Sequence, residues 1–168
     1  MVHMPRIEFI IKTGNDAQAG AGEDSRVYCS IAGREFRLEK SGEEFKRNAT
    51  DTFIAGQGSP PANITNPSEH DPSNPDLFLR NLPAETATVV PGNPGAAGTR
   101  PRPMTIRIVP KNQQKGWQLE DARVRVLGIG LSSGFPPSDV FNFRVVGGQN
   151  TNRWLGDDFG TSVELELV

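Results

Sequence analysis

Short runs in which apolar and polar residues alternate, separated by Gly and Pro, constrain the fold of this chain most strongly. Ile7, Phe9 and Ile11 occupy every second position of one such run, and the chain closes on another at 162–168. A period of two places successive side chains on opposite faces of a β-strand. The 18 Gly and 14 Pro residues supply turns and oppose long helices. The pattern predicts about eight or nine short strands.

The remaining alternating runs indicate how these strands are arranged. They lie at 26–31, 36–38, 50–54, 104–108, 117–126 and 140–145. No stretch repeats convincingly at the helical period. Strands joined by short turns favour antiparallel pairing, with apolar side chains facing inward and polar side chains facing solvent. The sequence therefore predicts an all-β, antiparallel β-sandwich.

The chain length suits one domain, which we assign to residues 1–168. Two stretches rich in Pro and Gly, 56–76 and 91–103, interrupt the alternating runs. Proline lacks the N–H that a central strand donates, so neither stretch fits inside a sheet. Long segments of this kind are usually functional or mobile. We therefore expect excursions at 56–76 and 91–103, and the run 77–90 between them could form one or two strands.

Charge and hydropathy exclude several classes of partner. The 18 Lys and Arg residues against 20 Asp and Glu give a net charge of −2, and no basic run is present, so no nucleic-acid partner is expected. No apolar run approaches the roughly 18 residues of a transmembrane helix. The N-terminus shows no apolar signal-peptide core, which slightly favours the cytoplasm. The single cysteine, Cys29, is expected to be a small buried core residue.

Residues suited to catalysis are few, and we expect no enzyme. His3 lies at the N-terminus, and His70 lies in a Pro-rich segment. A triad of Ser68, His70 and Asp71 is conceivable, but adjacent loop residues rarely converge on the required geometry. The sequence contains no Cys/His cluster for zinc and no phosphate-binding loop.

The stretch 13–33 joins two predicted strands with small residues and oxygen-bearing side chains. If its ends meet at one end of the sandwich, their carboxylates, amides and glycine carbonyls come together. Calcium prefers six to eight oxygen ligands of these kinds. An ordinary polar turn is the alternative reading. The candidate calcium ligands here are Gly14, Asn15, Asp16, Gly22, Glu23 and Asp24.

Several motifs occur in an order that resembles the PLAT family, the lipoxygenase-homology β-sandwich. They are the Thr13–Asn15 turn, Gly20–Asp24, Phe45–Phe53, Gly116-Trp117 and Asn152–Leu155. The family reads TGD, GAGTD, F-x-x-G-x-x-D-x-F, GW or AW, and NRWL at these points. The resemblance covers 6–55 and 104–168, and leaves 56–103 as an insertion.

The resemblance implies a fold and a role. The fold is an eight-stranded sandwich of two four-stranded sheets. PLAT domains dock an attached protein onto lipid or a protein partner without catalysis, and many bind calcium through loops at one end. Asn15 stands at the Asp of TGD, and Asp24 matches the Asp of GTD. Asn112 matches a further loop ligand, whereas Lys111 replaces an acidic residue and could reach Asp16 or Asp24.

Other residues of these motifs are expected to serve the core or a contact surface. Trp117 and Trp154 are predicted to be core residues, with Arg153 pairing a nearby carboxylate. Membrane or partner contact is predicted for Leu131 and Phe135 in one loop, and for Ile64 and Phe78 in the insertion. The alternative for Leu131 and Phe135 is that they fold back over a sheet edge.

Two functional hypotheses follow from these expectations. In the first, the chain is a non-catalytic docking domain that binds a lipid or membrane surface, assisted by calcium. In the second, it is a protein–protein interaction or assembly module that uses the sandwich and its 56–103 insertion. A fold alone does not decide between them.

Overall fold

The computed structural model describes residues 2–3, 6–21, 25–31, 34–72, 104–110, 116–127, 130–131, 140–146, 153–158 and 160–167. In these ranges the regular elements are strands, every named pair is antiparallel, and no helix occurs. The prediction of an all-β, antiparallel chain is confirmed. The strands are β1 (Val2–His3), β2 (Arg6–Thr13), β3 (Arg26–Ile31), β4 (Arg34–Arg37), β5 (Thr50–Gly56), β6 (Met104–Val109), β7 (Trp117–Leu127), β8 (Gly130–Leu131), β9 (Val140–Val145), β10 (Arg153–Leu155) and β11 (Ser162–Leu167).

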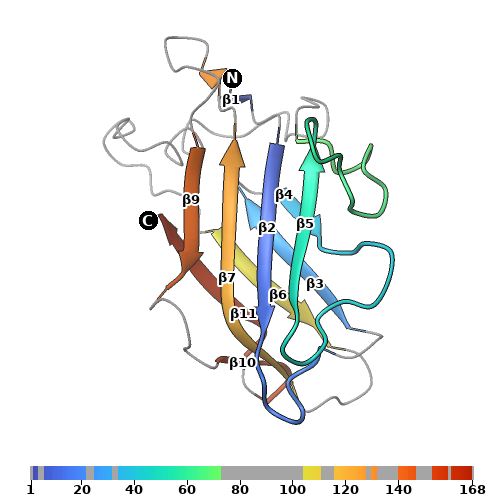
Figure 1. Cartoon of the computed structure of the whole chain (residues 1–168). Coiled ribbons are helices and arrows are strands. Elements are labelled where there is room, and N and C mark those ends of the chain that lie inside the picture. Colours follow the sequence, from blue (N-terminus) through green and yellow to red (C-terminus); the bar gives the residue numbers. More distant parts are fainter. Residues whose placement is uncertain are drawn as a thin grey trace, which may run out of the picture.

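The strands form one long curled sheet. Its order is β4-β3-β6-β11-β9-β7-β2-β5, with β10 added beside β7, and β1 pairs separately with β8. The sheet curls so that β5, β2, β7 and β9 lie in front of β4, β3, β6 and β11 (Figure 1). Pairing of β9 with β11, for example Val145 with Leu165, joins the two halves by hydrogen bonds. The described strands are therefore not clearly divided into the two four-stranded sheets that were predicted.

The core lies between the two halves of this sheet. Alternate residues of the strands fill it, as the sequence pattern predicts, and Phe9 of β2 meets Phe36 of β4 with ring centroids 5.6 Å apart. Cys29 is fully buried, as predicted, and burial raises the pKa of its thiol far above its usual range. The core provides a rigid frame whose outer faces and loops remain for function.

Residues 57–72, here called the closing segment, bridge the two edges of the curled sheet. On the β5 side, Asn63 Oδ1 accepts a hydrogen bond from Ile54 N at 2.7 Å, and Asn63 Nδ2 donates to Thr52 O at 2.9 Å. On the β4 side, Thr65 N donates to Glu39 O at 2.6 Å. Asn63 thus occupies the edge of β5 much as another strand would.

Two arginines from the sheet anchor the closing segment at its ends. Arg6 Nη1 donates to Pro60 O at 2.7 Å. Arg34 donates to Asp71 O at 3.0 Å and to Glu69 O at 2.6 Å. The first part of the predicted insertion is therefore integral to the fold, and residues 73–103 lie outside the described residues.

Ile64 in the closing segment corrects one prediction. Its side chain is only 4% exposed and belongs to the hydrophobic core, because the segment folds over the gap between the edges of β4 and β5. It is not an exposed membrane or partner contact. The polar sequence around it gave the appearance of a solvent-exposed loop.

Candidate functional site

Several residues that carry the family resemblance form a structural cluster at one end of the sheet. Trp117 is fully buried, as predicted, and its Nε1 donates to Thr13 Oγ1 at 3.1 Å. The ring of Phe45 stacks on Phe53 and meets Trp117 edge-on, with centroids 5.3 Å apart in both pairs. Burial of several large rings with a satisfied indole N–H serves stability. These residues are not available to a ligand.

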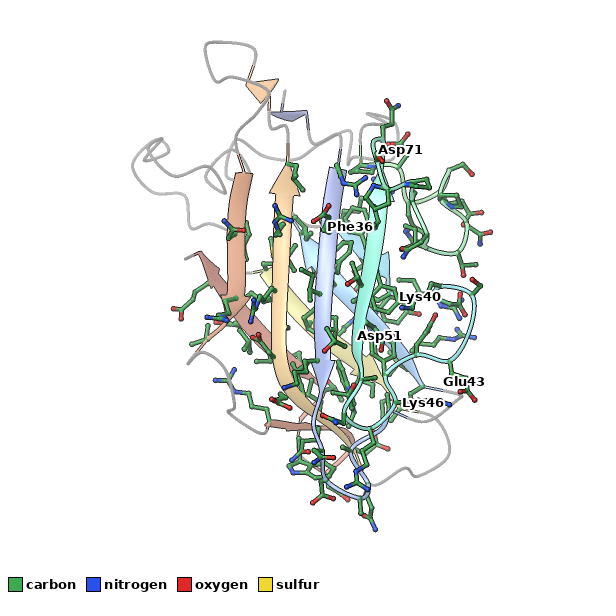
Figure 2. All side chains as sticks on the ribbon, viewed as in Figure 1. Phe36, Lys40, Glu43, Lys46, Asp51 and Asp71 are labelled. Atoms are coloured by element: carbon green, nitrogen blue, oxygen red, sulfur yellow. The ribbon has the colours of Figure 1, made fainter. Side chains whose placement is uncertain are left out.

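Asp51 of the same cluster is also used structurally. It is buried, its Oδ2 accepts a hydrogen bond from Phe45 N at 2.8 Å, and its Oδ1 pairs with Lys40 Nζ at 3.0 Å (Figure 2). Asn48 has a φ of 58° at the position where the family pattern has glycine. Asn tolerates this left-handed conformation better than most residues. Through its contacts with Phe45 N and Lys40 Nζ, the carboxylate of Asp51 shapes the loop between Lys40 and Thr50.

Gly14 in the predicted calcium loop is tightly packed. Its N–H donates to Gln118 O at 2.8 Å, and its carbonyl accepts from Asn48 N at 2.8 Å. A Cβ at this position would lie 2.0 Å from Gln118 Oε1, so a larger residue would displace the side chain of Gln118. The carbonyl of Gly14 is engaged within the fold.

Asn15 and Asp16 lie on the exposed turn that follows Gly14. Arg47 Nε donates to both Asn15 O at 2.8 Å and Asn15 Oδ1 at 3.1 Å. Asp16 Oδ1 accepts from Gln18 N at 3.0 Å. The guanidinium of Arg47 thus already binds both oxygens of Asn15, a contact that the sequence did not suggest. N–H groups therefore engage oxygens of both Asn15 and Asp16, and calcium binding at this half of the predicted site stays a prediction.

The other predicted site residues are only partly placed. No group of three or more His, Cys, Asp and Glu side chains that could hold a metal occurs within the described ranges. Leu131 lies in β8, where its backbone pairs with Val2. Trp154 lies opposite Gln118 in β10 and is half-buried. The predicted residues Gly22, Glu23, Asp24, Lys111, Asn112, Phe78 and Phe135 lie outside the described residues.

Arg153 differs from the prediction that it pairs a carboxylate. Its Nη2 donates instead to the backbone carbonyl of Val146. This contact ties β10 to the residue that follows β9. Arg153 therefore serves the local fold.

His70 lies at the anchored end of the closing segment. Its ring centroid is 6.1 Å from that of Phe36, and Arg34 binds the carbonyls of both Glu69 and Asp71 beside it. Figure 2 labels Phe36 and Asp71 at this end of the molecule. Burial, followed by the charge of Arg34, lowers the pKa of His70 below its ordinary value, although Glu69 opposes this shift. This shift favours the neutral form of the ring.

Acidification is expected to weaken the fold through His70. Because its folded-state pKa is lowered, the unfolded chain binds the proton more readily, and stability falls as the pH drops below about 6.5. Substituting Phe for His70 keeps an aromatic ring on Phe36 and removes the titration. The loss of melting temperature between pH 7.5 and pH 5.0 should then shrink. An equal loss in both proteins would show that His70 does not contribute.

A set of arginines faces outward from β7 and β9. Phe9, Val124 and Phe143 stand in register on β2, β7 and β9 and point into the core. The neighbouring positions therefore point outward. They include Arg123 and Arg125 of β7 and Arg144 of β9, which we name the arginine face. Their side chains are 46%, 42% and 29% exposed.

Two carboxylates hold the side chains of this face in place. Glu8 pairs through Oε1 with Arg6 Nε at 3.0 Å and through Oε2 with Arg125 Nη1 at 2.8 Å. Asp121 pairs through Oδ2 with Arg123 Nε at 2.8 Å and through Oδ1 with Arg144 Nε at 3.5 Å. Each carboxylate is thus shared by two arginines.

The sequence contained only part of the signal for this face. Arg123 and Arg125 alternate with Val124 and Val126, which predicts that both point to solvent. Arg144 comes from a separate strand, and its place opposite Arg123 depends on the register of β7 with β9. Nothing in the local pattern indicates that register.

Comparison with known proteins gives one weak similarity. No family model matches the chain, and no curated protein matches it. A solved structure, alpha toxin from Clostridium absonum, matches with 19% sequence identity and a TM-score of 0.48. The match covers 98% of this chain and 32% of the toxin chain, so this chain spans about a third of that protein. A match at this level assigns no function, and membership of the PLAT family stays a prediction.

Proposed function

We propose that this chain is a non-catalytic docking domain that binds an anionic lipid surface through the arginine face. The observation that supports this most is the exposure of Arg123, Arg125 and Arg144 on adjacent strands. No described element lies over this side of β2, β7 and β9 (Figure 1). Cations on an open sheet face can meet several headgroups of a bilayer at once.

The size of the expected attraction is moderate. A basic residue near an anionic membrane contributes about 1 kcal/mol. Three arginines then contribute at most about 3 kcal/mol, a factor of about one hundred in affinity, because Glu8 and Asp121 on the same face offset part of their charge. The net charge of the chain is −2, so the location of these arginines matters more than the total charge. Salt should weaken binding, because it screens exposed charges.

The structural roles of two polar side chains, Asp51 and His70, support the non-catalytic part of the proposal. Asp51 shapes a loop, and His70 packs against Phe36 in the closing segment. No membrane-crossing helix occurs within the described residues, and a peripheral domain needs none. Calcium binding at the ligands predicted from the sequence stays a prediction, as does a protein partner for the 56–103 insertion.

Vesicle co-sedimentation tests the proposal. The protein is mixed with phosphatidylcholine vesicles with and without phosphatidylserine, at low and high salt, and in calcium or chelator. We expect binding that requires phosphatidylserine, weakens with salt and persists in chelator. Replacing Arg123, Arg125 and Arg144 together with Gln should weaken it by up to about one hundredfold.

A control of equal charge makes this result specific. Gln at Arg26, Arg37 and Arg47, which lie off the arginine face, changes the net charge by the same amount. This variant should bind nearly as the unaltered protein does. Equal weakening in both triple variants, or no binding of the unaltered protein, would refute docking through this face. Binding only in calcium would restore the predicted calcium-assisted mode.

A further inference from the structure

We infer that Asp121 organises Arg123 and Arg144 into a paired site for a phosphate monoester headgroup on the lipid surface. This inference rests on the proposed function, since it assigns a preferred lipid to the same face. It goes further because general charge attraction would treat all anionic lipids alike at equal surface charge. The geometry of the pair points to a preference among them.

The two arginines are direct cross-strand neighbours. Arg123 of β7 is opposite Arg144 of β9 in the antiparallel register. Side chains in such positions have Cβ atoms about 4.5–5.5 Å apart, and like charges there destabilise a sheet. Carboxylates offset part of this repulsion, because Asp121 lies beside both arginines and Glu166 of β11 lies opposite Arg144 on its other side.

Asp121 supplies the local structure that holds them together. It is only 6% exposed and lies two residues before Arg123, on the same outward face. Arg123 Nε donates a hydrogen bond to Asp121 Oδ2 at 2.8 Å, whereas Arg144 Nε lies 3.5 Å from Oδ1 as an ion pair without a hydrogen bond. The carboxylate therefore orients the guanidinium of Arg123 through a hydrogen bond and attracts that of Arg144 by charge, while 46% and 29% of their side-chain surfaces stay accessible to solvent.

The chemistry of the headgroup follows from the donors that this arrangement presents. A guanidinium is a planar group with five N–H donors and binds phosphate through two parallel hydrogen bonds. Two such groups therefore suit an anion with more than two terminal oxygens. A phosphate monoester has three strong acceptor oxygens and a charge of about −1.5 to −2 at pH 7. A phosphodiester has two such oxygens and a single charge.

Arg125 provides an internal comparison. It lies opposite Glu8 on one side and Asn142 on the other, so it has no arginine neighbour in register. Its ion pair is with Glu8, at 2.8 Å. Arg125 should contribute charge to docking without contributing to the choice of headgroup.

The test compares vesicles that contain phosphatidic acid with vesicles that contain phosphatidylserine, matched in measured surface potential. The unaltered protein should bind phosphatidic acid about tenfold more tightly. Replacing Arg123 and Arg144 with Lys keeps the charge and removes the planar forks. This variant should keep its binding to phosphatidylserine and lose the preference, whereas Arg125→Lys should keep the preference.

Asp121→Asn separates positioning from charge, because charge alone predicts a change in overall affinity and positioning predicts a change in the preference between lipids. Removing a negative charge from the face should strengthen binding to every anionic vesicle if charge alone matters. Loss of the organising carboxylate should instead abolish the preference for phosphatidic acid. Circular dichroism and melting curves will establish that each variant is folded, and the double Lys variant serves as the test if Asp121→Asn is not.

Each outcome has a defined meaning. Equal binding of the unaltered protein to both lipids, or a preference retained in the double Lys variant, would overturn the paired site and leave the docking proposal intact. Absence of binding to either lipid would overturn both. Soluble glycerol phosphate should compete poorly, because it lacks the contacts of a surface with the rest of the arginine face. Full competition at low concentration would show that the site serves a free phosphate monoester.

Discussion

Replacement of Trp117 by Ala is expected to lower the free energy of unfolding by about 3–5 kcal/mol. The indole is fully buried, meets Phe45 edge-on and donates to Thr13 Oγ1. Truncation would leave a large cavity. It would also remove the indole N–H that donates to the hydroxyl oxygen of Thr13. It would also loosen the end of β2 on which the 14–21 turn depends.

Urea denaturation followed by circular dichroism measures this effect. Thr13→Val leaves the ring in place and deprives the indole N–H of its acceptor, so it should cost about 1–3 kcal/mol. The Ala variant must therefore be the weaker of the two. A loss below about 1 kcal/mol for Trp117→Ala would contradict the assignment of this residue to the core.

Ile64→Ala is expected to cost about 2–5 kcal/mol, as for a truncated core side chain. Ile64 fills the space between the edges of β4 and β5, where the closing segment crosses the open side of the sheet. The substitution removes the apolar contacts of the Ile64 side chain. It leaves in place the groups of Asn63 that form hydrogen bonds with β5. The effect should fall on stability and leave lipid binding unchanged.

Val146→Ala is the matched control for this substitution. Val146 is 39% exposed, so its truncation should change stability by no more than about 0.5 kcal/mol. Both variants are compared by urea denaturation and by vesicle binding. Normal stability with impaired vesicle binding in Ile64→Ala would reverse the structural interpretation and support Ile64 as a contact residue.

The strands were predictable because their signal is local. In β2 and β3, alternation of core and outward residues follows directly from the period of a pleated strand. The continuity of the sheet was not predictable in the same way. It depends on the pairing of Val145 with Leu165 and of neighbouring residues, which are distant in sequence, and no local pattern specifies that register.

The site predictions met a related difficulty. Oxygen-bearing residues at 15–16 indicated a cation site, but the cation that binds the Asn15 oxygens belongs to Arg47, 32 positions away. Arg123 and Arg144 are likewise distant in sequence, and the pairing of β7 with β9 brings them together. Ile64 was misjudged because the sequence around it is polar, whereas its burial comes from the two sheet edges that it bridges.

The way Asn63 caps β5 has a consequence for aggregation. An unprotected edge strand offers its backbone groups to any other extended chain and invites aggregation. Here the N–H and carbonyl of Ile54 and the carbonyl of Thr52 are already satisfied from within the molecule. Asn63 therefore blocks this part of the β5 edge against pairing with a strand of another molecule.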